Sequence, residues 1–194
     1  MQQGDVLARG EFERRYAAMD GLKKAELIEG IVYMPSPVRA DLHGIPHVRL
    51  ATLLQVYATK HPGLLVADNA TVRLDTLNEP QPDLLLMRAN GQARLDADGY
   101  ISGAPEFIAE IAASSASYDL HQKRRTYLRA GVLEYLVWLA DEDRLIWWQL
   151  KHDDYVEIQA NAEGLLESGS FPGLVIDPPA LTTGELATAL ARLR

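Results

Sequence analysis

The chain of 194 residues contains no cysteine. This absence excludes disulfide bonds, thiolate zinc sites, iron–sulfur clusters and cysteine nucleophiles, and it fits the reducing cytoplasm. Long apolar runs are lacking as well. The most apolar stretch, residues 132–140, is nine residues long and contains Glu134, whereas a membrane-spanning helix needs about 20 residues. Because residues 1–15 also lack the apolar segment of a signal peptide, we expect a cytoplasmic protein with no membrane partner.

An excess of basic residues is also missing. The chain has 19 Lys and Arg against 27 Asp and Glu, which gives a formal net charge of −8. A protein that coats nucleic acid through bulk charge is basic, so this class is disfavoured. An enzyme that binds nucleic acid through one local basic patch and divalent metals is compatible with the charge balance. The phosphate-cradling glycine loops are absent, and we expect no nucleotide cofactor.

Periodicity and turn signals predict helices and strands that alternate along the chain. Helices are expected over residues 11–19, 47–59, 118–130 and 184–193, and strands over residues 64–66, 71–74, 83–87, 106–113, 134–140, 144–150 and 155–158. Residues 24–34 are expected to be extended around a turn at Glu29-Gly30, and residues 88–104 to form a loop or lid. This order predicts an α/β fold with a central mixed sheet flanked by helices. Without repeats or low-complexity segments, we expect one domain over residues 1–194.

Three acidic residues stand in apolar, strand-like surroundings: Glu29, Asp83 and Glu110. Burying a lone carboxylate is expensive, so a buried acid normally has a cationic partner or a metal. Carboxylates on adjacent strands form the oxygen ligand set that Mg²⁺ prefers, with Mn²⁺ as an alternative, and such a metal promotes phosphodiester hydrolysis. The alternative is structural: each acid lies at a solvated strand end or pairs with an arginine.

The predicted helix over residues 118–130 carries a basic run. Lys123 and Tyr127 have i, i+4 spacing and share a face, while Arg124 and Arg125 point elsewhere. We interpret Lys123 as the group that orients the attacking water or counters transition-state charge, and its two neighbours as phosphate contacts. The alternative is a basic face exposed to solvent. Asp119, one turn before Lys123, is expected to cap the helix or to pair with the lysine.

Two histidines, His43 and His47, have the i, i+4 spacing of a zinc pair. Pro46 between them fits only the first turn of a helix, so the two rings need not lie on one face. A single histidine at the rim of an active site is the favoured interpretation. The three tryptophans lie in strand patterns and are expected in the core rather than on a base-stacking surface.

Four segments together resemble a known family. GIVYMPSPV, QPDLLLM, PEFIAEIAASSASYDLHQKRRTYLRAGVLEYLVW and FPGLVID are similar to the Uma2 family of the bacterial PD-(D/E)xK nuclease superfamily. The resemblance covers residues 12–180, and the C-terminal helix follows this core. It implies a restriction-endonuclease-like core whose central mixed sheet presents two acids from its second and third strands.

The resemblance also implies roles for individual residues. Asp83 matches the aspartate of the PD element, Glu110 the acid of the third strand, and Glu29 the acid from the N-terminal part of the core. The lysine expected two residues after the second acid is replaced by Ala112, and Lys123 of the next helix stands in for it. His43 matches a histidine after the Ser-Pro element, with His47 as a rival for this position.

Together, the residues and the resemblance predict a metal-dependent endonuclease that hydrolyses DNA. Asp83 and Glu110 would bind Mg²⁺ with help from Glu29. Arg124, Arg125 and His43 would contact DNA. The alternative is a catalytically silent module of the same fold that binds DNA or a protein partner, and a weaker one is a hydrolase of phosphorylated small molecules. Cutting both strands would favour a homodimer.

Overall fold

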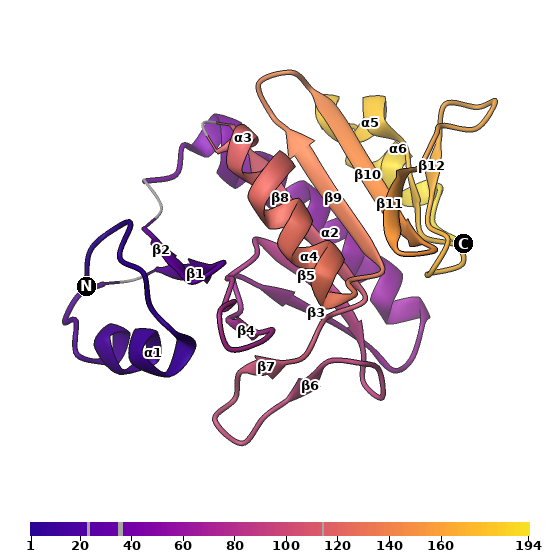
Figure 1. The fold of residues 1–194 in the computed structure, drawn as a ribbon. Helices are drawn as coiled ribbons and strands as arrows, with labels where there is room; N and C mark the ends of the chain where they lie inside the picture. The colour runs from indigo at the N-terminus through magenta and orange to yellow at the C-terminus, as the bar shows by residue number, and fades with distance from the viewer. Residues whose placement is uncertain (23, 35–36, 114) are drawn as a thin grey trace.

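A six-stranded mixed sheet lies at the centre of the computed structural model (Figure 1), which describes residues 1–22, 24–34, 37–113 and 115–194. In spatial order the strands are β11 (Asp154–Glu157), β10 (Arg144–Lys151), β9 (Glu134–Leu139), β8 (Phe107–Ala112), β5 (Leu84–Arg88) and β3 (Leu64–Asp68). Only β8 and β9 run parallel; the other neighbours are antiparallel. Every residue of β8 and β9 is buried, as their continuous apolar character predicts.

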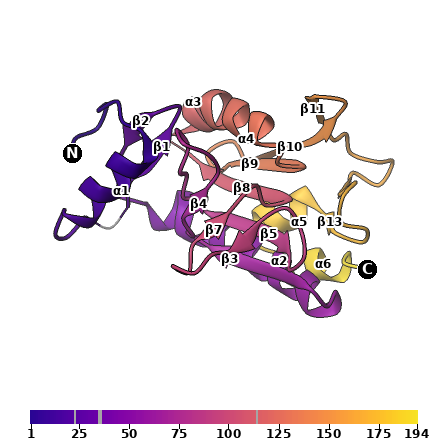
Figure 2. The same ribbon diagram turned by 60° about the horizontal axis from the view of Figure 1, so that its bottom comes forward.

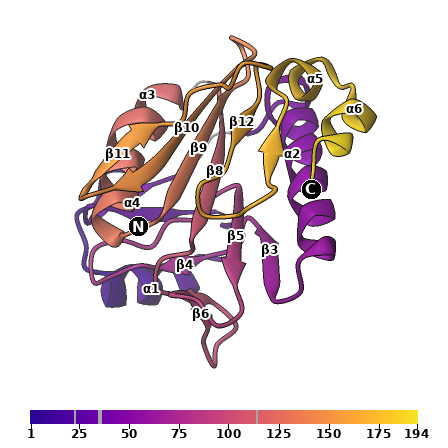
Figure 3. The same cartoon turned by 90° about the vertical axis from the view of Figure 1, so that its right-hand side faces the viewer.

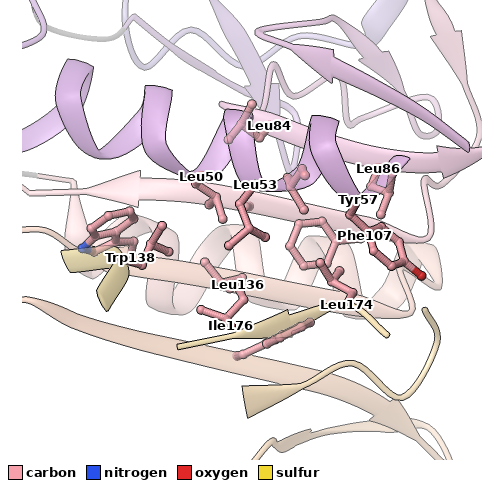
Figure 4. Close-up of a cluster of buried hydrophobic side chains, with 14 of the residues drawn as sticks. Leu50, Leu53, Tyr57, Leu84, Leu86, Phe107, Leu136, Trp138, Leu174 and Ile176 are labelled. Atoms are coloured by element: carbon pink, nitrogen blue, oxygen red, sulfur yellow. The ribbon is translucent and has the colours of Figure 1, made fainter. Parts of the chain in front are cut away.

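Helices cover both faces of this sheet (Figure 3). One face packs against α2 (Ile45–Lys60), α5 (Pro178–Thr183) and α6 (Leu186–Ala191). Figure 4 shows part of this core, in which Phe107, Leu136 and Trp138 contribute from β8 and β9. The other face packs against α4 (Arg124–Ala130), which follows α3 (Ala116–Tyr118) and the π-helical turn η2 (Asp119–Lys123). Asp83, Leu85 and Met87 alternate onto this second face, as do Ile108 and Glu110.

Smaller units flank the central sheet. They are α1 (Arg9–Ala17), the hairpin of β1 (Glu26–Ile28) and β2 (Ile31–Tyr33), the π-helical turn η1 (Ala40–Gly44), the sheet of β4 (Val72–Arg73), β7 (Ile101–Ser102) and β6 (Arg94–Leu95), and the pair β12 (Leu166–Glu167) and β13 (Val175–Ile176). Figure 2 shows the N-terminal units and the C-terminal helices at opposite ends of the molecule. Glu29 and Gly30 form the turn of the β1–β2 hairpin. Their φ angles are 54° and 76°, and a two-residue turn of this kind needs positive φ at both positions.

The α/β architecture expected from the sequence is confirmed, and most expected elements are present within two or three residues of their predicted ends. The expected loop over residues 88–104 is wrong in part, because it contains β6 and β7. The helix expected over residues 118–130 is divided by a π-helical turn and ends at Gly131, whose φ is 82°. The tryptophans are in the core, as predicted. Trp138 and Trp147 are at most 1% exposed, and Trp148 is 9% exposed. Within the described ranges, no helix has the length and apolarity needed to cross a bilayer.

Candidate active site

Two acidic side chains face each other from adjacent strands. Leu84 of β5 pairs with Ala109 of β8, and the same antiparallel register places Asp83 opposite Glu110 on one face of the sheet. Each carboxylate accepts a hydrogen bond from the backbone of the other strand. The Asp83 amide donates to Glu110 Oε2 at 3.4 Å, and the Ile111 amide donates to Asp83 Oδ2 at 2.9 Å. Asp83 is 6% exposed and Glu110 only 2%. The sheet therefore presents a buried pair of carboxylates at one point.

Lys123 supplies the charge that faces this pair. Its ammonium donates to Glu110 Oε1 at 3.0 Å, and it lies 3.0 Å from Glu26 Oε1 and 3.7 Å from Asp119 Oδ1. Lys123 is 3% exposed, so the solvent-exposed basic face considered for it is wrong. Burial alone would lower the pKa of Lys123, but the three carboxylates raise it well above its ordinary value. The lysine is therefore charged and fixed in position.

Tyrosines complete this side of the cluster. Tyr127, one turn after Lys123, donates its hydroxyl to Glu110 Oε1 at 2.9 Å, which confirms that the two residues share a face. The ring of Tyr118 lies 5.4 Å from the Lys123 ammonium and packs on Tyr33, with 4.3 Å between ring centroids. The Tyr118 hydroxyl is buried and has no hydrogen-bond partner among the described residues. A buried hydroxyl without a partner is a group that a ligand or water can satisfy.

Basic side chains lie on the other side of Asp83. His43 Nε2 is 3.1 Å from Asp83 Oδ2, and the Lys24 ammonium is 3.6 Å from Oδ1. His47 Nε2 contacts the Asp83 carbonyl at 3.0 Å and the Asp68 carboxylate at 3.1 Å. The two histidine rings are stacked with their centroids 5.7 Å apart. Both histidines thus contact Asp83, but only His43 reaches its carboxylate.

Burial and neighbouring charges shift the pKa values of the clustered acids in opposite directions. Desolvation raises the pKa of Glu110 to about 8 and that of Asp119 to about 6, although Lys123 lowers both. Burial would also raise the pKa of Asp83, but the hydrogen bond from His43 and the charges of Lys24 and Lys123 hold it well below its usual range. The cluster contains the carboxyl groups of Glu26, Asp83, Glu110 and Asp119 and the ammonium groups of Lys24 and Lys123. It therefore has an excess of two negative charges when all four acids are ionised.

Comparison with known proteins identifies the family of the chain. The model of the Uma2 family, described as "Putative restriction endonuclease", matches residues 10–182. The chain belongs to the Uma2 family. Among solved structures, it is similar to a protein from Anabaena variabilis described as a putative nuclease belonging to DUF820, with a TM-score of 0.68 and 13% sequence identity over 88% of this chain and 96% of that one. At this identity the likeness shows a shared fold. No curated protein matches the chain.

The structure of this Uma2 chain brings together three of the four residues expected to act in catalysis, namely Asp83, Glu110 and Lys123. It does not place Glu29 with them. The Glu29 carboxylate instead contacts the guanidinium groups of Arg125 and Arg129. Glu26 takes the position expected of Glu29, because residue 29 is in the hairpin turn whereas residue 26 lies in β1. The turn at Glu29-Gly30, recognisable in the sequence, was the available signal that the acid within the strand is Glu26.

The basic residues of the Uma2 helix have different surroundings. Arg124 donates to the Tyr155 carbonyl at 3.3 Å, and its guanidinium lies over the rings of Trp148 and Tyr155 at 5.3 and 5.6 Å. This arginine ties the helix to β11. Arg125 is more than half exposed. Asp119 pairs with Lys123, one of its two expected roles, whereas Lys24 was missed, because nothing in the sequence relates it to Asp83.

The donor set can be tested against a divalent cation. Asp83 and Glu110 supply hard oxygen ligands from adjacent strands, as Mg²⁺ prefers. With all four acids of the cluster ionised, the two surplus negative charges equal the charge of one such ion. In the part of the chain that the structure describes, no group of three or more His, Asp or Glu side chains is arranged to hold an ion. The ammonium of Lys123 occupies the space between Glu26 and Glu110, at 3.0 Å from each. Asp83 and Glu110 are therefore the two carboxylates of this cluster that would hold such an ion.

Proposed function

We propose that this Uma2 chain is a metal-dependent endonuclease that hydrolyses DNA phosphodiester bonds. The observation that carries the proposal is the pairing of Asp83 with Glu110 across β5 and β8, with the Lys123 ammonium on Glu110. Strongly perturbed carboxylate pKa values are typical of functional sites, and here they occur on the acids that the PD-(D/E)xK resemblance singles out. Structural ion pairs perturb pKa values too, so activity is the test.

Asp83 and Glu110 would hold Mg²⁺ or Mn²⁺, and Glu26 would assist in the role expected of Glu29. When bound, such a cation lowers the pKa of a water molecule and neutralises charge on the phosphate. Every carboxylate assigned here is buried, and Asp83 is kept ionised by His43 and Lys24. An ionised Asp83 is ready to bind a cation at neutral pH without first losing a proton.

Residues of the chain itself would orient the reaction. Glu26 and Asp119 fix the Lys123 ammonium, which therefore keeps its proton and donates hydrogen bonds to the attacking water or to a phosphate oxygen. Tyr127 holds Glu110 Oε1, so that Oε2 stays turned toward Asp83. His43, 19% exposed at its side chain, lies at the rim, where a DNA phosphate would approach. The buried groups bind and orient, while the rim admits the substrate.

The test is cleavage of supercoiled, linear and single-stranded DNA by the purified chain with Mg²⁺, Mn²⁺, Ca²⁺ or EDTA. We expect cleavage with Mg²⁺ or Mn²⁺, none with EDTA, and binding without turnover with Ca²⁺, which is larger and coordinates more loosely. Asp83→Asn and Glu110→Gln should each abolish cleavage. The matched control Glu163→Gln removes one exposed carboxylate close to Arg192 and should cleave as the wild type does.

The remaining outcomes separate the alternatives. Binding of DNA without cleavage under every condition would favour the catalytically silent module. Cleavage by Asp83→Asn at the wild-type rate would place the active site elsewhere. Linear product without a nicked intermediate, together with a dimeric mass in sedimentation, would support the homodimer, because one centre cuts one strand.

A further inference from the structure

Two exposed arginines converge on one carboxylate outside the buried cluster. The Arg125 guanidinium lies 3.4 Å from Glu29 Oε2, and the Arg129 guanidinium donates to Glu29 Oε1. Arg125 and Arg129 are one helical turn apart on α4, and their side chains are 53% and 60% exposed. Like charges at i, i+4 repel each other unless an anion lies between them. Here Glu29 provides that anion.

The backbone holds Glu29 in this place. Its φ of 54° is in the left-handed region, which glutamate rarely adopts. The Glu29 amide donates to Asn78 Oδ1 at 2.7 Å, and the Gly30 amide donates to the Leu77 carbonyl at 2.8 Å. Asn78 is held in turn by hydrogen bonds from its amide to the Asp75 carboxylate. These contacts fix the position from which the Glu29 carboxylate reaches the two arginines.

The geometry of the two arginines matches a phosphodiester. Each guanidinium contacts a different oxygen of one carboxylate, as it would contact the two free oxygens of a backbone phosphate. Two positive charges against one negative charge leave one positive charge exposed, on a protein whose net charge is −8. Arg124 has its own partners on β11 and does not contribute.

We propose that Arg125 and Arg129 form a binding site for a nucleic-acid backbone phosphate, and that Glu29 occupies this site until the phosphate displaces it. The inference rests on the proposed function and extends it to how the substrate is held. Lys123 and Arg129 are six residues apart, which is about 9 Å along a helix axis. One DNA strand advances about 3.4 Å for each nucleotide. For a strand that runs parallel to the helix, the site would bind a phosphate two or three nucleotides from the one that is cut.

A purely structural role for the same contacts makes the opposite prediction. If Glu29 only ties the β1–β2 hairpin to α4, Glu29→Gln loosens the hairpin, lowers the unfolding temperature and leaves DNA affinity unchanged or weaker. If Glu29 competes with phosphate, Glu29→Gln strengthens DNA binding. The sign of the change in affinity decides between the two roles.

The experiment measures binding of a fluorescently labelled DNA duplex by anisotropy, with the full chain in EDTA, between 50 and 200 mM salt. Arg125→Gln and Arg129→Gln should each weaken binding about threefold to tenfold and reduce the slope of log Kd against log salt by about one. Glu29→Gln should tighten binding by a similar factor and steepen that slope. The matched controls Arg192→Gln and Glu163→Gln alter an exposed pair beside α6, on the other face of the sheet, and should change Kd less than twofold.

Equal effects of Arg125→Gln, Arg129→Gln and Arg192→Gln would overturn the phosphate site, as would weaker binding by Glu29→Gln. A fall in unfolding temperature for the arginine variants, without loss of affinity per folded molecule, would assign the contacts to stability alone. Wild-type cleavage of DNA together with unchanged affinity of the variants would reject this site and leave the proposed function intact. A folded wild type that neither binds nor cuts DNA would reject both.

Discussion

The carboxylate of Glu26 lies 3.0 Å from the ammonium of Lys123, and both side chains are at least 95% buried. The contact joins the β1–β2 hairpin to the turn before α4, so the N-terminal part of the chain completes the buried cluster. Lys123 also contacts Glu110 and Asp119. One ammonium therefore offsets charge contributed by three separate elements of the chain.

Removing this ammonium should destabilise the protein. Lys123→Met leaves the carboxylates without their shared partner, and breaking a buried ion pair in this way costs about 3–5 kcal/mol. Urea denaturation at pH 8 should show a loss of that size, and a smaller one at pH 5, where the carboxylates can take up protons. Lys151→Met, at the exposed end of β10, is the matched control and should change stability little. A loss for Lys123→Met no larger than the control's would mean that the cluster is solvated.

Two acids of this cluster contribute to the pH dependence of stability, as Glu79 does with its raised pKa. The pKa of Glu110 rises from 4.5 to about 8 on folding, and that of Asp119 from 3.8 to about 6. Between pH 4.5 and 8 the folded protein therefore binds more protons than the unfolded chain, so its stability falls as the pH rises. Each group contributes up to about 1.4 kcal/mol per pH unit. Below about pH 4, where Asp83 becomes protonated on unfolding but stays ionised when folded, the trend reverses.

Urea denaturation at intervals between pH 5 and 8 measures this slope. Glu110→Gln should flatten it, and added Mg²⁺ should restore stability mainly at pH 8, because a cation binds the ionised carboxylates. Stability that rises from pH 5 to 8 in the metal-free wild type would contradict the raised pKa values.

The two tyrosines near Lys123 allow a paired comparison. Tyr127→Phe removes one of the two donors to Glu110 Oε1, the other being Lys123, and should cost about 0.5–1.5 kcal/mol, the usual net contribution of a hydrogen bond. Tyr118→Phe removes a buried hydroxyl without a partner among the described residues and should leave stability unchanged or higher. Thermal unfolding of both variants checks the difference. Equal losses would show that the Tyr118 hydroxyl has a partner in solution.

The sequence was sufficient to predict the placement of residues that depends on the spacing within one helix or strand. Asp83 and Glu110 interrupt continuous apolar strands, and the central strands of a mixed sheet bring such positions together. Lys123 and Tyr127 share a face because i, i+4 spacing requires it on a helix. These relationships involve period and spacing, which a single sequence records directly.

Long-range register was not predictable. The turn at Glu29-Gly30 was visible in the sequence, but the contact of Glu26 with Lys123, far along the chain, was not. Lys24 meets Asp83 only after the hairpin has folded against the sheet. Strands β6 and β7 have two residues each, which is too short for a period to be visible, and β7 pairs with β4 across the segment between them. Sequence patterns therefore identify the chemistry more reliably than the partners that surround it.

Measurements of metal affinity can test whether Glu26, rather than Glu29, is the third acid of the site. Glu26→Gln removes a carboxylate from the cluster that contains Asp83 and Glu110, which should weaken the attraction of a divalent cation. We expect the Mn²⁺ affinity, measured by calorimetry on the metal-free protein, to fall about tenfold, equivalent to about 1.4 kcal/mol. Glu29→Gln removes a carboxylate that two arginines already offset, so its Mn²⁺ affinity should stay within twofold of the wild type. The two variants differ by three positions in one hairpin and carry the same chemical change, so each is the control for the other. A tenfold loss for Glu29→Gln with no loss for Glu26→Gln would restore Glu29 as the third acid of the site.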